Sequence, residues 1–205
     1  MHGCAEELRA LVDLAAPDEV VLVGDLFTKG PDPAGVWQLV RERGFRSVLG
    51  NHDQRVIDAA ADPASPDRRA RIVAEVLERA DPACLPWLRD LPLFVEAAGW
   101  TVVHAGLHPS GDLALTDRRM ALTLRRWPLE QPSDPYWHAQ YTGERRVAFG
   151  HDARRGLVRV ERDGAPWVLG LDTGCVYGGR LSGYLVEADE VLQVEARRVY
   201  KPVGP

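Results

Sequence analysis

Four apolar runs along this chain end in the same way, with a glycine beside histidine, asparagine or aspartate. The four endings are Gly24-Asp25, Gly50-Asn51-His52-Asp53, His104-Ala105-Gly106 and Gly150-His151-Asp152. A short apolar run closed by glycine is typical of a buried strand. One such ending is usually a turn or a helix cap. Together with His2-Gly3, the four endings contain four of the six histidines of the chain. This grouping predicts that the strand ends converge on one site.

The first two runs are joined by a helical pattern. Residues 20–23 and 47–49 are predicted strands, and 34–43 is a predicted helix that stops at Gly44. Strand, helix and strand in about 35 residues form a βαβ unit with parallel strands. Ligands in such sheets bind outside the carboxyl ends of the strands. We therefore expect Asp25 and Asn51 to lie close together.

The remaining chain predicts a mixed architecture. Helices are expected over 5–14, 54–61, 68–80 and 86–90. Strands are expected over 94–96, 100–103 and 146–149, and antiparallel strands over 157–160, 167–171, 181–186 and 191–199. Residues 109–143 form an irregular, cap-like segment with clustered arginines and aromatic side chains. The pattern indicates a single domain over 1–205 of the α/β (α+β) class, with a two-layer β-sandwich flanked by helices.

Composition narrows the class of protein. The formal net charge is −5, which argues against a nucleic-acid scaffold. No run approaches the ~20 apolar residues of a membrane span, and no signal peptide is expected. Three widely spaced cysteines indicate a reducing compartment rather than a disulfide framework. A cytoplasmic protein is expected.

The residue types at the strand ends indicate metal chemistry. Asp, Asn and His suit two divalent ions of intermediate hardness such as Mn, Fe or Zn. Two such ions ~3.5–4 Å apart clamp a phosphoryl group and generate a hydroxide nucleophile. Asp25 is suited to bridging them, because each carboxylate oxygen can bind one ion.

The order of these motifs resembles the calcineurin-like metallophosphoesterases, whose pattern is D-x-H, G-D, G-N-H-[DE], H-A-G and G-H. All but the first Asp are present between His2 and His151. Within that family the chain is most similar to the bacterial branch shared by Ser/Thr protein phosphatases and symmetrical diadenosine tetraphosphatases. Two segments, Gly24-Asp25-Leu26-Phe27-Thr28-Lys29-Gly30-Pro31-Asp32 and 171–179, resemble the tetraphosphatases of that branch.

The resemblance implies a role for each matched residue. His2 would bind the first metal, and Asp25 would bridge both. The second metal would be bound by Asn51, His104 and His151. His52 would act as the general acid, and Lys29 would contact a phosphate oxygen where the family usually has Arg. Arg125 is either a second phosphate contact or an ordinary surface arginine. His108 and His138 are expected to be structural.

The resemblance is incomplete in two places. Thr28 stands where protein phosphatases carry an aspartate that orients the general-acid histidine, which favours nucleotide substrates. The leading Asp of D-x-H and the strand before it are missing. We expect the natural protein to begin upstream with a strand that ends in Gly-Asp. Without it, we expect weak binding of the first metal and reduced stability.

The predicted function is two-metal hydrolysis of phosphate esters or anhydrides by metal-bound hydroxide. Dinucleoside polyphosphates such as diadenosine tetraphosphate are favoured over phosphoproteins. Trp127, Tyr136, Trp137 and Tyr141 either stack on a base or, more commonly for such residues, pack the cap. A catalytically inactive module that binds nucleotides or a partner is the alternative of another class. A nuclease is disfavoured by the acidic charge, and neither nucleic-acid nor membrane partners are expected.

Overall fold

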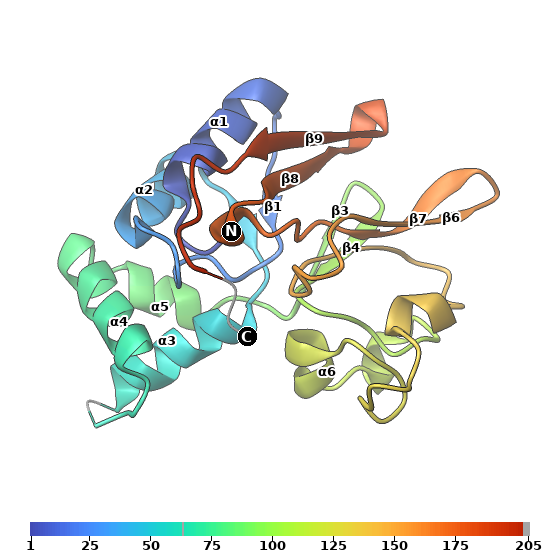
Figure 1. Cartoon of the computed structure of the whole chain (residues 1–205), viewed down its shortest axis with the longest axis horizontal. Helices are drawn as coiled ribbons and strands as arrows, with labels where there is room; N and C mark the ends of the chain where they lie inside the picture. The colour runs from blue at the N-terminus through green and yellow to red at the C-terminus, as the bar shows by residue number, and fades with distance from the viewer. Residues whose placement is uncertain (63, 203–205) are drawn as a thin grey trace.

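The computed structural model describes residues 1–62 and 64–202 (Figure 1). A five-stranded mixed sheet has the order β3-β4-β5-β7-β6. β4 (Trp100–Val103), β5 (Arg146–Phe149) and β7 (Ala165–Gly170) run parallel, while β3 (Phe94–Ala97) and β6 (Val158–Arg162) are antiparallel edge strands. Two strand pairs accompany it: parallel β1 (Val21–Leu22) with β2 (Arg46–Ser47), and antiparallel β8 (Arg180–Leu185) with β9 (Glu190–Glu195). The predicted mixed α/β class is confirmed.

The two faces of the five-stranded sheet bury alternate residues, as a period of two requires. On one face Trp100, Val102, Ala148 and Leu169 pack against Val21, Val23 and Tyr184, so β1 and β8 form a second layer. On the other face Val103, Val147, Phe149 and Val168 pack against Leu107, Leu124 and Trp137. Residues 109–143 supply this second cover, with α6 (Arg118–Thr123) and the short helix η2 (Trp137–Gln140).

Helices make a third core around β1. They are α1 (Ala5–Ala15), α2 (Pro33–Arg43), α3 (Asn51–Ala61), α4 (Arg68–Ala80) and α5 (Cys84–Arg89) (Figure 1). α2 connects β1 to parallel β2, so the predicted βαβ unit is confirmed. Its ends have the expected signals: Asp32 accepts from the Gly35 N–H at 2.8 Å, and Gly44 is left-handed at φ 65°. None of the helices in the described ranges has the length and apolar character needed to cross a bilayer.

The structure differs from the sequence expectation at several boundaries and in one strand pairing. α3 begins at Asn51 rather than at 54, because the Asp53 carboxylate accepts from the Gly50 N–H and caps the helix. β7 is antiparallel to β6 as expected but parallel to β5. β9 ends at Glu195 rather than at 199, because the Arg197 N–H turns away and donates to Glu7.

An apolar cavity of about 660 Å³ separates part of the two strand layers. Its wall includes Leu11 from α1, Val21 and Val23 around β1, Trp100 from β4 and Tyr184 from β8. Among the described strands β1 pairs only with β2, so its other edge carries no strand. The cavity extends to His2 and Asp25, where the polar strand ends meet.

Candidate metal centre

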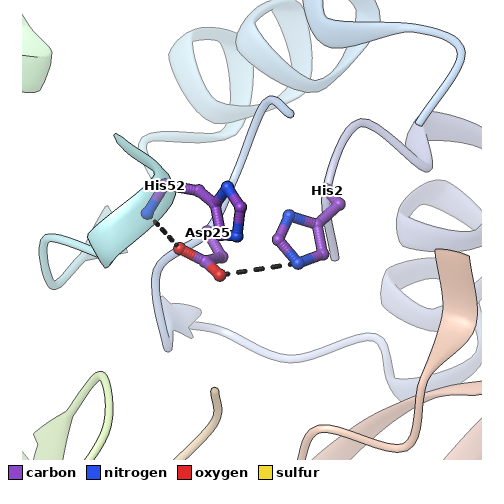
Figure 2. A group of neighbouring side chains, drawn as sticks. All are labelled: His2, Asp25 and His52. Carbon is purple, nitrogen blue, oxygen red and sulfur yellow. Dashed lines mark hydrogen bonds and ion pairs between the residues drawn. The ribbon is translucent and has the colours of Figure 1, made fainter. Parts of the chain in front are cut away.

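Asp25 is the centre of the site (Figure 2). It follows β1 and is 5% exposed. Its Oδ2 lies 3.4 Å from Nε2 of His2, and its Oδ1 lies 3.4 Å from Nε2 of His104. The backbone N–H of His52, in the first turn of α3, donates to Oδ1 at 2.9 Å. One carboxylate therefore joins two histidines that are 102 positions apart in the chain.

Uncommon backbone conformations position this group. His2, Asp25, Lys29 and His151 all have positive φ, at 58°, 56°, 69° and 70°. Non-glycine residues adopt this region rarely, and such strain is concentrated at functional sites. Gly50 permits the close approach, since a Cβ there would collide with the backbone nitrogen and Oδ1 of Asp25. The turns are therefore shaped to bring Asp25 against α3.

Asp53 supports the carboxylate from behind, a role that the motif assignment missed. Its Oδ2 accepts from the Asp25 N–H at 2.7 Å and the Gly50 N–H at 3.1 Å, and its Oδ1 accepts from the Leu26 N–H at 2.8 Å. The side chain is fully buried. Its place three residues after Gly50, at the start of a helix, is the capping-box position that could have predicted this contact.

Acceptor atoms converge beside Asp25. Nδ1 of His104 donates to the Val23 carbonyl at 2.7 Å, which leaves Nε2 with a lone pair. That nitrogen lies 3.0 Å from Oδ1 of Asn51, and Nδ1 of His151 lies 3.2 Å from the same oxygen. Nε2 of His151 is buried without a hydrogen-bond partner. Nitrogen and oxygen atoms of three side chains that commonly bind metals therefore lie together, and this donor set fits a divalent metal.

His2 lies on the opposite side of Asp25. Its Nδ1 is 3.1 Å from the Thr28 hydroxyl, and its Nε2 is 3.0 Å from Nζ of Lys29. The His2 and His52 rings meet edge to face, with centroids 5.0 Å apart. Ligand atoms of His2, Asp25 and His52 all lie within 4.8 Å of one another, as do those of Asp25, His104 and His151. Asp25 is shared by both groups, which suits a bridging carboxylate.

Burial sets the protonation of the centre. It lowers the pKa of His2 well below the ordinary value, that of His52 to about 4 and that of His151 to about 3. Burial alone would raise the pKa of Asp25, but His104, His2 and the His52 N–H overcome it and lower that pKa. Neutral histidines around an ionised carboxylate are the form in which these groups bind metals.

Arg125 lies at the edge of the centre. Its Nε is 3.8 Å from Oδ1 of Asp152, the neighbour of His151. The aromatic group of the cap is mostly engaged in packing. Trp137 is buried against Phe149 and Tyr141, and Tyr136 lies between the guanidinium groups of Arg126 and Arg155, at 4.2 and 4.3 Å. These contacts favour the packing interpretation of Trp137 and Tyr136 over base stacking.

The structure thus brings together His2, Asp25, Lys29, Asn51, His52, His104 and His151. A model of the calcineurin-like phosphoesterases matches residues 1–170. The chain belongs to that family. As a calcineurin-like phosphoesterase, it is a metal-dependent hydrolase, and phosphate esters or anhydrides are its substrates.

Two relatives of this calcineurin-like phosphoesterase carry the same name. It is 30% identical over 263 residues to a symmetrical bis(5'-nucleosyl)-tetraphosphatase of Aromatoleum aromaticum, covering 96% of this chain and 94% of the relative. It is 29% identical over 273 residues to a protein of the same name from Ralstonia nicotianae, and this match covers 100% of this chain and 94% of that relative. Both alignments are longer than the 205 residues of this chain, so these relatives carry additional residues within the matched region.

Solved structures agree on the fold. A crystal structure provisionally assigned as a diadenosine tetraphosphatase superposes with a TM-score of 0.79 at 31% identity, covering 95% of this chain and 90% of that one. A metallophosphoesterase from Sphaerobacter thermophilus superposes with a TM-score of 0.62 at 17% identity, covering 95% and 84%. The second likeness concerns the fold alone.

Proposed function

We propose that this phosphoesterase hydrolyses dinucleoside polyphosphates, with diadenosine tetraphosphate as the type substrate. The observation that carries the proposal is the carboxylate of Asp25, shared between His2 on one side and His104 on the other. A site of this kind treats phosphoanhydrides and phosphoesters alike, so the geometry alone does not select the substrate. Support for a nucleotide comes from the relatives, which are named symmetrical tetraphosphatases.

Each residue has a distinct proposed task. Asp25 would be shared by two divalent ions, His2 would help to hold the first, and Asn51, His104 and His151 would help to hold the second. When bound, such ions neutralise phosphate charge and lower the pKa of water. The Nδ1–H of His104 is already committed to the Val23 carbonyl, which fixes the ring orientation that a ligand needs. Manganese, iron and zinc all suit this donor set.

Lys29 and His52 act on the substrate in this proposal. Lys29 donates to a phosphate oxygen after releasing Nε2 of His2, its partner at 3.0 Å. His52 is neutral at pH 7, because burial lowers its pKa to about 4. A polyphosphate beside the ring would raise that pKa, as a nearby negative charge favours the imidazolium. His52 would then protonate the leaving oxygen. Arg125, at the edge, would contact a second phosphate.

Hydrolysis of diadenosine tetraphosphate with added Mn²⁺ tests the proposal, with products separated by chromatography. We expect two ADP per substrate, and no ADP above background from Asp25→Asn. Asp58→Asn is the matched control, since Asp58 is an exposed acid on α3 that contacts Gln54. Release of ATP and AMP would contradict symmetrical cleavage. Turnover of a phosphopeptide but not of the nucleotide would instead support a protein phosphatase. If neither substrate were hydrolysed, the result would support an inactive binding module.

The compartment is a separate part of the proposal. We propose a cytoplasmic enzyme, because a dinucleoside polyphosphate is an intracellular type of substrate and Cys4, Cys84 and Cys175 are all buried free thiols. Phosphoproteins remain the second candidate class of partner. Fractionation of the source cells followed by immunodetection would locate the protein directly.

A further inference from the structure

A second group of metal-ligand atoms lies outside the centre around Asp25. It consists of Cys4, Glu7 and Cys175, whose ligand atoms all lie within 4.8 Å of one another. All three side chains are at least 97% buried, with exposed fractions of 0%, 1% and 3%. The other groups of this kind among the described residues both contain Asp25. This cluster is the one that offers sulfur.

Two distant segments build the cluster. Cys4 directly precedes α1, and Glu7 lies in the first turn of that helix, three residues on and therefore on the same face. Cys175 begins the short helix η3 (Cys175–Tyr177), after left-handed Gly174. Val176, Leu181 and Tyr200 pack around the two cysteines. The apolar surround excludes water from the ligand atoms.

Only one of the two oxygens of the Glu7 carboxylate has hydrogen-bond partners. Its Oε1 accepts from the Arg197 backbone N–H at 3.0 Å and from the Tyr200 hydroxyl at 2.6 Å. Its Oε2 is buried and has no hydrogen-bond partner. A buried acceptor without a partner is strongly unfavourable, and more so when it is charged. The unpaired oxygen therefore indicates that Glu7 is suited to binding a cation together with the two thiols.

The two sulfur atoms lie within 4.8 Å of one another and of a Glu7 carboxylate oxygen. We propose that Cys4, Glu7 and Cys175 bind a zinc-type divalent ion, separate from the ions around Asp25. Two sulfurs and one carboxylate oxygen are ordinary zinc ligands. Each thiol releases its proton to solvent as the ion binds.

The surrounding contacts suit this role. The Arg197 N–H and the Tyr200 hydroxyl hold Oε1, in the way that outer hydrogen bonds orient metal ligands, and leave Oε2 without a partner. The ion would connect the start of α1 to 175–177 and 197–200. Because Cys4 is two residues after His2, the same ion would also anchor the turn that carries His2.

Cobalt titration distinguishes this site from the centre around Asp25, which offers only nitrogen and oxygen ligands. Chelator-treated, reduced protein should develop a sulfur-to-cobalt charge-transfer band with one equivalent of Co²⁺. The band should disappear in Cys4→Ser and in Cys175→Ser, and persist in Cys84→Ser, which removes the buried thiol of α5. Glu7→Gln should lower the Co²⁺ affinity at least tenfold. Wild type without a band, or a band that survives Cys4→Ser, overturns the proposal.

A second measurement does not depend on activity. In the Asp25→Asn background, zinc should raise the temperature of thermal unfolding, and adding Cys175→Ser should abolish the rise. This measurement does not use nucleotide hydrolysis as its readout, so the two proposals can fail separately. A Cys4–Cys175 disulfide in freshly isolated protein, found by alkylation and mass spectrometry without reductant, would replace the metal site and overturn it.

Discussion

The backbone N–H of Asp25 donates to Oδ2 of Asp53 at 2.7 Å, so the bridging carboxylate is held by a second, fully buried carboxylate. Asp53 also accepts from the Gly50 and Leu26 N–H groups. It thus fixes the turn at Asp25 through backbone hydrogen bonds. The site is supported by an acid that acts through the backbone.

Replacing Asp53 tests this support. Asp53→Asn places an amide N–H₂ among three N–H donors, so at least one hydrogen bond is lost and Asp25 is free to tilt. We expect the Mn²⁺ concentration for half-maximal activity to rise about 10–100-fold, with circular dichroism unchanged. Asp58→Asn, on the same helix, should match wild type. An unchanged Mn²⁺ requirement in Asp53→Asn would show that Asp25 is held by other contacts.

Lys29 offers a test of phosphate binding. Lys29→Met keeps much of the side-chain length but removes the charge, and hydrogen bonds to charged groups contribute about 1.5–3 kcal/mol. We expect kcat/KM for diadenosine tetraphosphate to fall about 10–100-fold, mainly through KM. Lys29→Arg should retain most of the activity. Lys201→Met changes the other lysine of the chain and should leave kcat/KM unchanged. An equal fall of kcat/KM in Lys201→Met would show that the overall charge of the protein, rather than a contact between Lys29 and phosphate, causes the effect.

His138 makes stability depend on pH. Burial, followed by the charge of Arg155, lowers its pKa to about 4 from the ordinary 6.5. The unfolded chain therefore takes up the proton first as pH falls, so the stabilisation is complete above 6.5 and is lost between about 6.5 and 4. His138→Gln should lessen this loss by on the order of 1–3 kcal/mol at pH 4.

Urea unfolding of both proteins at pH 7 and pH 4 provides the measurement. His2, His52 and His151 have lowered pKa values and act in the same direction. Asp53 opposes them, because burial and Asp25 raise its pKa to about 6. Equal pH dependence in wild type and His138→Gln would show that His138 is protonated without penalty.

Trp137 connects the cap to the site. It is 1% exposed, packs on Phe149, and donates from Nε1 to the Ala105 carbonyl at 3.1 Å, next to His104. Trp137→Ala should lower the free energy of unfolding by about 3–5 kcal/mol, and Trp137→Phe by about 1 kcal/mol through the lost hydrogen bond. Trp167→Phe is the control, since half-buried Trp167 makes the same kind of bond, to Gly143 at 3.0 Å. Chemical denaturation compares the three.

The sequence predicted those parts of the site that depend on strand ends. Asp25 and His104 follow apolar runs closed or flanked by glycine, and the parallel geometry of a βαβ unit brings such endings together. Asp53 was missed because its role is to accept three N–H bonds across turns, and no spacing rule records which turn packs on which. The contact of Lys29 with His2 has the same origin, since it depends on a left-handed residue at position 29. The start of α3 at Asn51 follows from the cap that Asp53 makes with the Gly50 N–H rather than from helix propensity.

Because β1 pairs with a described strand on one side only, we expect it to open locally more readily than a strand that is paired on both sides. Among the described strands β1 pairs only with β2, so its other edge lacks the ladder bonds that a second neighbouring strand would supply. Amide hydrogens there should exchange with solvent faster than those of β4, which is paired on both sides. Asp25 follows this strand directly, so the central metal ligand is carried by one of the segments that opens most readily. Ion binding at Asp25 would therefore order β1 as well, and slower exchange at residues 21–23 after metal addition would report it before any substrate is turned over.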